Sequence, residues 1–193
     1  MPEFVCRDCG AAFLLPQHIL DRYPGWVPRQ CRNCRHGAPA RNAKPPDQVT
    51  DPHTGVFTDG SSVPNPGPGG WGVVYVVDDE IVAERFGHDP DTTNNRMELT
   101  ALLVALEVVP EGTAITVYSD SNLAVRTITE WAPGWEKRGW KRKTGPVENR
   151  DLVEPVYHGY RRRPELELQW IKAHVGFKWN EYADRLAARW RET

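Results

Sequence analysis

Four carboxylates constrain the fold of this chain more than any other feature. Each lies on, or at the end of, a segment with a clear strand or helix pattern, where a packed α/β domain would bury a neutral group instead. An ionised carboxylate is costly to bury unless it is paired or bound to a cation. The pattern therefore predicts a fold that gathers four side chains around a shared positive charge: Asp59, Glu98, Asp120 and Asp184.

Two of these carboxylates close predicted strands. A short apolar and β-branched run ends at Asp59, just before a Gly/Ser/Pro-rich turn, and a second buried run, 114–119, ends at Asp120, where a helical pattern begins. Open α/β sheets place ligands at this carboxyl end of their strands. We therefore expect both aspartates at one edge of a sheet.

The other two carboxylates lie on predicted helices. Glu98 shares a helical stripe with Ala101, Leu102 and Ala105, which puts an acid on the buried side of its helix. Asp184 flanks the apolar stripe of the last helix. Neighbouring carboxylates raise one another's pKa and need a counter-charge, and an all-oxygen ligand set favours Mg²⁺ or Mn²⁺. An ordinary turn or capping residue is the alternative for any one aspartate, but it does not explain all four.

The order of the predicted elements indicates an α/β domain. Three strands in a meander precede an alternation of helix and strand, with Asp78-Asp79-Glu80 as the turn of a hairpin. Pro155 predicts a kink or an early break in the third helix. The predicted strands are 54–60, 71–77, 81–87, 114–119 and 165–172, and the predicted helices are 93–109, 121–131, 149–160 and 178–191.

The residues that flank the carboxylates resemble type 1 ribonuclease H. The matching segments follow the order and spacing of that family over essentially all of residues 54–191. They are Phe57-Thr58-Asp59-Gly60-Ser61, Asn65-Pro66-Gly67 with Gly69-Gly70-Trp71-Gly72, 92–99, Tyr118-Ser119-Asp120-Ser121, 134–140, Asn149-Arg150-Asp151-Leu152, and His174 followed by Asn180-Glu181 and Ala183-Asp184.

The resemblance implies a ribonuclease H-like fold, with a five-stranded mixed sheet and helices on both faces. It also implies an endonuclease that hydrolyses the RNA strand of RNA/DNA hybrids and leaves 5′-phosphate and 3′-hydroxyl ends. Two Mg²⁺ (or Mn²⁺) ions would flank the scissile phosphate, one activating water and the other stabilising the leaving oxygen. Asp59 would bridge both ions, and Glu98, Asp120 and Asp184 would supply the remaining ligands.

A histidine and several polar loop residues extend the implied site. His174 resembles a flexible-loop histidine that assists proton transfer or product release, and a loop histidine without function is the alternative. The 2′-hydroxyl marks RNA, so residues in the minor groove would read it. By resemblance these substrate contacts are the backbone of Gly60, the side chains of Ser62, Asn94, Asn95 and Glu98, the phosphate-holding pair Thr93 and Asn65, and Asn122, where many relatives carry glutamine. An ordinary turn role is the alternative for each Asn and Ser.

Cations interleaved with tryptophans lie between two predicted helices and resemble the basic protrusion that grips the DNA strand in longer family members. The cations would neutralise phosphates and so raise affinity for the nucleic acid, and the indoles would pack on sugars or stiffen the protrusion. A solvated loop whose indoles pack on the domain is the alternative. The cluster consists of Trp131, Trp135, Lys137, Arg138, Trp140, Lys141, Arg142 and Lys143. The run 161–163 of three arginines instead favours the negative pole of a helix.

All four cysteines lie near the amino terminus in two pairs, each with two residues between its members. Paired spacing of this kind indicates a structural Zn²⁺ site, formed by Cys6, Cys9, Cys31 and Cys34. A segment of this size needs such a metal to fold, and redox cysteines or disulfides are the alternative. The sequence thus predicts a zinc-ribbon-like domain at 1–44, a Pro-rich linker at 45–53 and the catalytic domain at 54–193.

The role of the amino-terminal module is less constrained by the sequence. Residues 1–44 hold seven Lys/Arg and three Asp/Glu, a balance of +4, whereas residues 45–193 have a balance of −6. This asymmetry favours an accessory contact with the hybrid, and stability or a protein partner is the alternative. No stretch is long and apolar enough to cross a membrane. We expect a cytoplasmic monomer.

Two other classes of function stay open at this point. A hybrid-binding protein that does not cut would be expected to have lost one of the four acids, and all four are present. A DNA-cutting relative of the wider fold, such as an integrase or junction resolvase, would lack the 92–98 motif and the basic protrusion.

Overall fold

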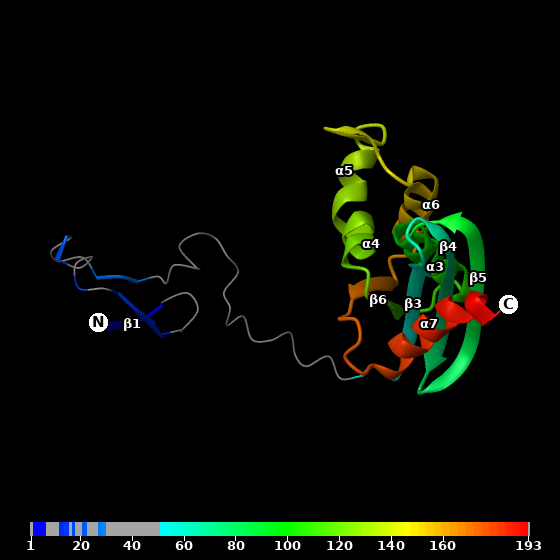
Figure 1. Cartoon of the computed structure of the whole chain (residues 1–193), viewed down its shortest axis with the longest axis horizontal. Helices are drawn as coiled ribbons and strands as arrows, with labels where there is room; N and C mark the ends of the chain where they lie inside the picture. Colours follow the sequence, from blue (N-terminus) through cyan, green and yellow to red (C-terminus); the bar gives the residue numbers. More distant parts are fainter. Residues whose placement is uncertain are drawn as a thin grey trace. The chain divides into compact units, whose positions relative to one another are not determined.

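The computed structural model describes residues 2–6, 12–15, 17, 21–22, 27–29 and 51–192. The chain divides into two compact units, Met1–Thr50 and Asp51–Thr193 (Figure 1). Among the helices that the structure describes, none has the length and apolar character that crossing a membrane requires.

In the first unit, two short strands form an antiparallel pair. Strand β1 (Glu3–Val5) pairs with β2 (Ala12–Leu14), and Val5 lies opposite Ala12. Cys6 directly follows β1 and is buried. The other three predicted zinc ligands, Cys9, Cys31 and Cys34, lie outside the described residues.

The second unit contains the five-stranded mixed sheet that the sequence predicts. Its strands lie in the order β5-β4-β3-β6-β9. The first three strands along the chain form an antiparallel meander, and the last two run parallel to β3. The strands are β3 (Gly55–Ser62), β4 (Gly67–Val77), β5 (Glu80–Thr92), β6 (Ile115–Ser119) and β9 (Leu166–Trp170).

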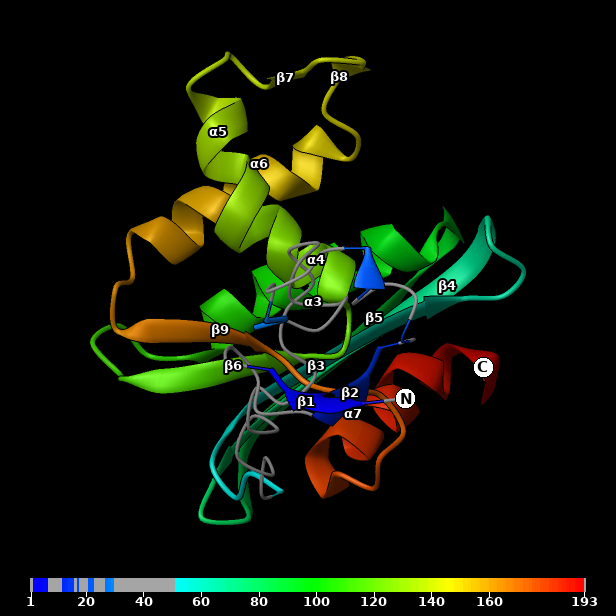
Figure 2. The ribbon, with the colours of Figure 1, turned by 90° about the vertical axis from the view of Figure 1, so that its left-hand side faces the viewer.

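Helices cover both faces of this sheet (Figure 2). Along the chain they are α3 (Asn94–Val108), α4 (Asn122–Arg126), the π-helical turn Thr127–Trp131, α5 (Ala132–Glu136), α6 (Arg150–Arg161), α7 (Lys178–Ala188) and the 3₁₀ turn Arg189–Glu192. A small hairpin of β7 (Lys141–Arg142) and β8 (Gly145–Pro146) follows α5.

Alternating side chains of the central strands fill two separate cores. Val56 and Val73 pack in the cluster that includes α3 and α6, whereas Phe57 and Val74 pack in the cluster that includes Trp179 of α7. Successive residues of a strand point to opposite faces, so a strand covered on both sides needs apolar residues at every position. This explains why the central strands have continuous apolar runs in the sequence.

The boundaries of several elements differ from the prediction. Strands β4 and β5 extend beyond their predicted ends to form a long antiparallel ribbon, whose turn places Asp78 and Asp79 at positive φ. The predicted helix 121–131 continues through the π-helical turn into α5. These extensions depend on pairing between strands and on helix packing, which local patterns do not record.

Helix α6 passes Pro155 without ending, so the predicted early break is wrong. Proline removes the hydrogen bond to the carbonyl four residues before it, here that of Asp151 in the first turn. Asp151 is exposed, and water can satisfy its carbonyl. Burial of Val153, Val156 and Tyr157 then holds the helix together around the proline.

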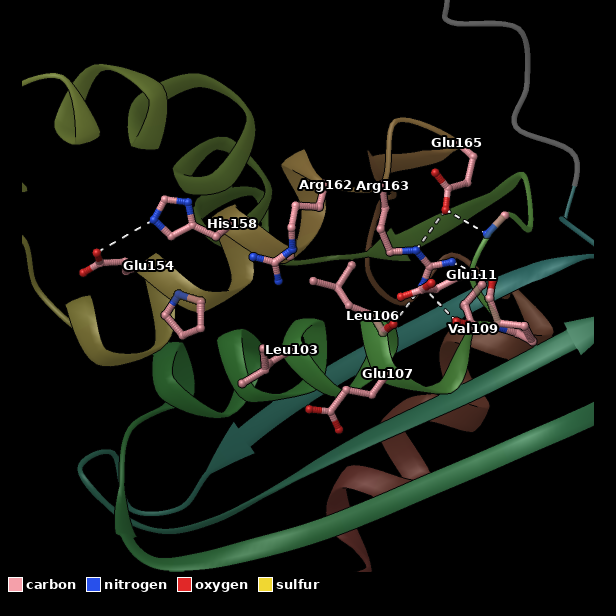
Figure 3. A pocket seen from close by; sticks show the side chains of 14 residues that line it. Leu103, Leu106, Glu107, Val109, Glu111, Glu154, His158, Arg162, Arg163 and Glu165 are labelled. Atoms are coloured by element: carbon pink, nitrogen blue, oxygen red, sulfur yellow. Dashed lines mark hydrogen bonds and ion pairs between the residues drawn. The ribbon is translucent and has the colours of Figure 1, made fainter.

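A cavity of about 1180 Å³ opens between α3 and α6, and none of the predicted site residues lines it (Figure 3). At one end Arg163 donates hydrogen bonds to the carbonyls of Leu106, Val109 and Pro110, at 2.8, 2.8 and 2.7 Å. The prediction that the arginine run ends a helix at its negative pole is confirmed by α6, which has Arg161 in its last turn and Arg162 as its C-cap. Arg163 in addition caps the carboxyl end of α3.

Candidate active site

Pairing within the sheet brings Asp59 and Asp120 together. Strands β3 and β6 are parallel, with Thr58 opposite Ser119. Asp59 directly follows Thr58 and Asp120 directly follows Ser119, so the two aspartates lie side by side. Asp59 also lies within the antiparallel pairing with β4, opposite Gly72. Asp120 directly follows the last residue of β6, as the sequence predicts, whereas β3 continues past Asp59 to Ser62, so the prediction that Asp59 ends its strand is wrong. Both carboxylates nevertheless follow the point where the parallel pairing of β3 with β6 ends.

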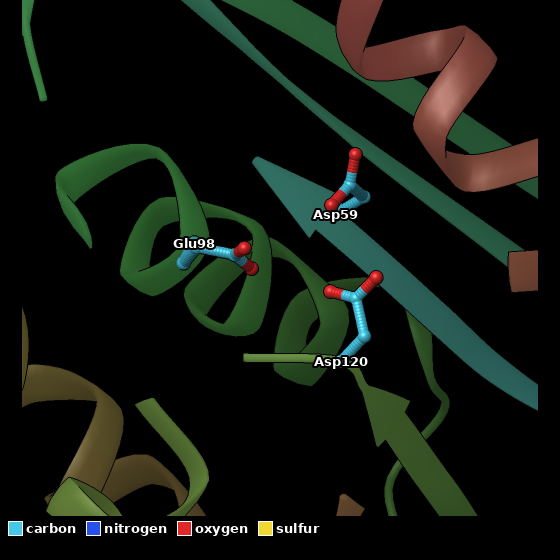
Figure 4. A group of neighbouring side chains, drawn as sticks. All are labelled: Asp59, Glu98 and Asp120. Carbon is cyan, nitrogen blue, oxygen red and sulfur yellow. The ribbon is translucent and has the colours of Figure 1, made fainter. Parts of the chain in front are cut away.

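Close packing of α3 on β3 adds Glu98 to this pair. A Cβ atom at Gly60 would lie 2.3 Å from the backbone nitrogen of Glu98, so only glycine permits this approach. Oxygens of Asp59, Glu98 and Asp120 all lie within 4.8 Å of one another (Figure 4). Asp184, on α7, is not part of this compact group of three, but its carboxylate lies close enough to help raise the pKa of Asp59.

The electrostatics of the three carboxylates favour the binding of a cation. Burial, together with the charges of Asp120 and Asp184, raises the pKa of the Asp59 carboxyl to about 7. Burial and the charges of Asp59 and Asp120 hold the pKa of Glu98 well above its ordinary value. The Oε2 atom of Glu98 is buried and has no hydrogen-bond partner among the described residues. An orphaned carboxylate oxygen of this kind fits a hard divalent cation.

Two residues that the sequence analysis did not assign support Asp120. The side-chain amide of Asn180 donates to its Oδ2 atom at 3.2 Å, and the indole of Trp170 donates to its backbone carbonyl at 2.9 Å. Burial raises the pKa of the Asp120 carboxyl, and the hydrogen bond from Asn180 and the charge of His174 oppose that rise. Asn180 is a polar residue on the buried stripe of α7, the same signal that singled out Glu98.

His174 lies on the loop between β9 and α7. It is exposed and has a φ of 51°, in the left-handed region. Its charge lowers the pKa of Asp120, so His174 lies within electrostatic range of that carboxylate.

The predicted minor-groove residues form one hydrogen-bonded network at the start of α3. The Oδ1 atom of Asn94 accepts from the backbone and the hydroxyl of Ser62, at 2.6 and 3.0 Å. Asn65 accepts from the same hydroxyl at 3.2 Å and from the backbone of Asn94 at 3.3 Å. Thr93 caps α3 by accepting from the backbone N–H of Arg96. The structure thus brings these residues together beside Gly60.

A second group of predicted contacts lies along α3, α4 and α5. Asn95, Trp131 and Trp135 line one cavity of about 110 Å³. Arg126 stacks on the ring of Trp131, with 4.9 Å between the guanidinium carbon and the ring centroid, a contact that sequence reasoning missed. Asn122 begins α4, and its backbone N–H donates to the carbonyl of Asp120.

The cations of the predicted protrusion follow this group along the chain. Lys137, Arg138 and Lys141 are exposed. Trp140, in contrast, is 6% exposed and packs against Tyr157 and His158. Of the two roles predicted for the indoles, stiffening of the protrusion therefore suits Trp140.

Comparisons with known proteins match the unit that carries this site. The ribonuclease H family model matches residues 51–192. The ribonuclease H of Methylorubrum extorquens strain PA1 is 46% identical over 132 residues, which cover 68% of this chain and 57% of that protein. The ribonuclease H of Gluconobacter oxydans strain 621H is 42% identical over 142 residues, 73% of this chain and 93% of that protein.

Solved structures agree with these sequence relatives. LC9-RNase H1, a type 1 RNase H with the type 2 active-site motif, has a TM-score of 0.57 and 31% identity, covering 71% of this chain and 72% of its own. LC11-RNase H1, solved in complex with an RNA/DNA hybrid, has a TM-score of 0.52 and 27% identity, covering 69% of this chain and 93% of its own.

Proposed function

The chain belongs to the ribonuclease H family, and from this premise we propose that it hydrolyses the RNA strand of RNA/DNA hybrids by a two-metal mechanism. The products would carry 5′-phosphate and 3′-hydroxyl ends. One observation carries the metal-dependent part of the proposal: two buried carboxylates and a half-buried one each bring an oxygen within 4.8 Å of the others, and one oxygen of Glu98 lacks a partner among the described residues. The named relatives and LC11-RNase H1, with its bound hybrid, support the substrate.

The carboxylates would hold two Mg²⁺ or Mn²⁺ ions. We assign Asp59, Glu98, Asp120 and Asp184 as the residues that would supply the ligands. When bound, the ions supply an activated water and stabilise the charge on the leaving oxygen. Neutralising the cluster also removes the repulsion that raises the pKa of Asp59.

Neighbouring side chains would orient the reacting groups. Asn180 fixes the rotamer of Asp120 by holding Oδ2, which leaves Oδ1 of that carboxylate for a ligand. His174 stands exposed on a loop beside the cluster, where it can take up or release a proton at the scissile phosphate.

Substrate selection would come from the network at the start of α3. Ser62, Asn65 and Asn94 hold one another in place before substrate arrives, which lowers the entropy cost of binding. Their remaining donors and acceptors, with the backbone of Gly60 and the side chains of Thr93 and Asn95, would contact the 2′-hydroxyls and a DNA phosphate. The exposed Lys137, Arg138 and Lys141 would neutralise phosphates of the DNA strand.

We also propose that residues 1–44 form a zinc-ribbon-like module. The pairing of β1 with β2 supports this assignment, because Cys6 directly follows β1 in an antiparallel pair of short strands. Burial of Cys6 in so small a unit agrees with a ligand role. The module would raise hybrid affinity, with stability or protein docking as the alternative. The protein would be a monomer in the cytoplasm. Reducing conditions there keep cysteine thiolates available for Zn²⁺.

Cleavage of a hybrid labelled on its RNA strand tests the proposal. The parent protein with Mg²⁺ should cut the RNA only, and EDTA should stop the reaction. Asp59→Asn should lower the cleavage rate at least about 1000-fold, because a neutral amide cannot bridge two cations. A hybrid with the label on the DNA strand and a labelled DNA duplex serve as substrate controls. Tight hybrid binding without any cutting by the parent would contradict the proposal and favour a binding protein.

A further inference from the structure

Helix α7 does not cap its own amino terminus. Phe177, its N-cap residue, makes no side-chain capping hydrogen bond with any described residue. The backbone N–H of Lys178 instead donates to Oδ2 of Asp51 at 3.1 Å, from a residue 127 positions earlier in the chain. The first N–H groups of a helix have no partner inside it, so this carboxylate supplies a cap that the local sequence lacks.

A second carboxylate that is distant in the sequence binds side chains in the first turn of α7. Asp79, in the β4–β5 turn, accepts hydrogen bonds from the indole of Trp179 at 2.8 Å and the ammonium of Lys178 at 3.2 Å. Asp79 also pairs with His53, and its backbone N–H donates to the carbonyl of His53 at 2.7 Å. Residues 51–54 and the β4–β5 turn are therefore fastened to each other and to the start of α7. Negative charge there also suits the helix dipole.

The first two turns of α7 carry groups that reach the carboxylate cluster. Asn180, two residues after the capped N–H, donates to Asp120, and Asp184 is close enough to Asp59 for its charge to raise the pKa of that carboxyl. Trp179 is 4% exposed and packs in the core with Phe57 and Ile171. A shift or fraying of the first turn would therefore move Asn180 away from the Asp120 carboxylate.

We propose that Asp51 is a positioning residue for the metal centre. By capping α7 it keeps Asn180 on Asp120 and Asp184 beside Asp59, and thereby sets the affinity of the cluster for divalent cations. The inference rests on the proposed function, since it takes these carboxylates to be metal ligands. The Oδ1 atom of Asp51 is buried without a hydrogen-bond partner among the described residues. Burying a carboxylate oxygen without a hydrogen bond costs free energy, and the cap that Asp51 provides for α7 compensates for that cost.

Metal binding without nucleic acid tests the inference in the full-length protein. Calorimetric titration with Mg²⁺ and with Mn²⁺ at 25 °C should give Asp51→Ala a dissociation constant roughly 10-fold above that of the parent, the size typical of residues that orient ligands. Asp51→Asn should stay within about 2-fold, because an amide oxygen caps a helix as well as a carboxylate does. Glu107→Ala removes an exposed carboxylate from α3 and is the matched control with parental affinity.

Two further readouts separate positioning from general stability. Amide hydrogen exchange over residues 178–184 should rise in Asp51→Ala and return to the parental level in Asp51→Asn. The kcat of Asp51→Ala at limiting Mg²⁺ should fall and recover with excess Mg²⁺, while KM for the hybrid stays constant. A lower melting temperature with unchanged Mg²⁺ affinity and unchanged exchange would overturn the inference and leave Asp51 a structural residue.

A milder variant covers the case in which Asp51→Ala does not fold at 25 °C. Asp51→Glu keeps the charge and moves the acceptor by one methylene, so its Mg²⁺ dissociation constant should lie between those of the parent and of a fully uncapped helix. If Asp51→Glu kept the parental Mg²⁺ affinity while its α7 amides exchanged faster, the result would contradict the proposed link between the cap and metal binding. A parent protein that binds Mg²⁺ but cuts no hybrid would count against the proposed function, and the comparison between variants would still decide the role of Asp51.

Discussion

At the scale of single residues, Asp59 illustrates how a buried carboxylate among other acids lowers stability. Its pKa is about 7 in the folded protein, against 3.8 for an unperturbed aspartate. Because the folded-state pKa lies above the unfolded one, this group favours folding most below about pH 4, and that contribution is lost as the pH rises through 7. At neutral pH and without bound cations, the Asp59 charge therefore destabilises the fold.

The first prediction concerns the removal of that charge. In Mg²⁺-free buffer at pH 7.5, Asp59→Asn should raise the free energy of unfolding by roughly 1–3 kcal/mol, given about 1.4 kcal/mol for each unit of pKa shift and some relaxation of the coupled acids. The gain should disappear at pH 4, where the parental carboxyl is already protonated. Urea denaturation followed by tryptophan fluorescence measures both values.

Glu107→Gln is the control for this measurement, since it removes an exposed charge that has no hydrogen-bond or ion-pair partner among the described residues and should change little at either pH. An equal loss of stability by Asp59→Asn at both pH values would show that the carboxylate has a structural role that the charge repulsion does not outweigh.

At the scale of elements, helix α3 depends on caps from outside its own sequence. Thr93 caps its start, close to Glu98, whereas the guanidinium of Arg163, 11% exposed, satisfies three carbonyls at its end. Arg163 also pairs with Glu165 at 3.0 Å, which holds the guanidinium in place. Different residues thus cap the amino end of α3, which lies near Glu98, and its carboxyl end.

The second prediction follows from this separation. Arg163→Ala should lower the free energy of unfolding by roughly 2–4 kcal/mol, because it leaves three carbonyls at the end of α3, two of them partly buried, without their charged donor. Cleavage at 20 °C should stay close to the parental rate, since Glu98 lies at the opposite end of the helix. Thermal melting and initial rates, measured on the same preparation, test both parts.

Arg162→Ala is the matched control for Arg163→Ala, because its neighbouring guanidinium makes none of the three carbonyl contacts. It should leave the melting temperature within about 1 °C. Equal destabilisation by the two variants would indicate that the loss of positive charge, and not the cap, is responsible.

At the scale of the whole molecule, two compact units of opposite charge balance share one chain. The unit that matches the ribonuclease H family contains the complete carboxylate group, so cleavage does not require residues 1–44 in any step proposed above. Those residues carry the balance of +4 and the four cysteines.

The third prediction concerns the amino-terminal module. Deletion of residues 1–44 should leave kcat within about 2-fold while weakening hybrid binding at moderate salt roughly 10-fold, and it should reduce the slope of log affinity against log salt. The full-length protein should contain one Zn²⁺ per chain by atomic absorption, and the deletion variant none. Unchanged affinity and slope would favour a stabilising or protein-docking role instead.

Sequence patterns predicted the type and order of the elements in the second unit and marked the acids that the structure gathers. Strand and helix periodicities record which faces are buried, and an acid on a buried face or at the end of a strand stands out against them. That signal located Asp59, Glu98, Asp120 and Asp184, and the same signal at Asn180 would have added the partner of Asp120.

Tertiary structure alone decided which distant groups support the site and the fold. Asp51 caps α7 across 127 residues, and Arg163 caps α3 across more than 50. The burial of Trp140 against Tyr157 likewise depends on the packing of α6. A local pattern reports the environment of a residue but not the identity of its partner, because hydrogen bonds and packing join atoms that are close in space and not in sequence.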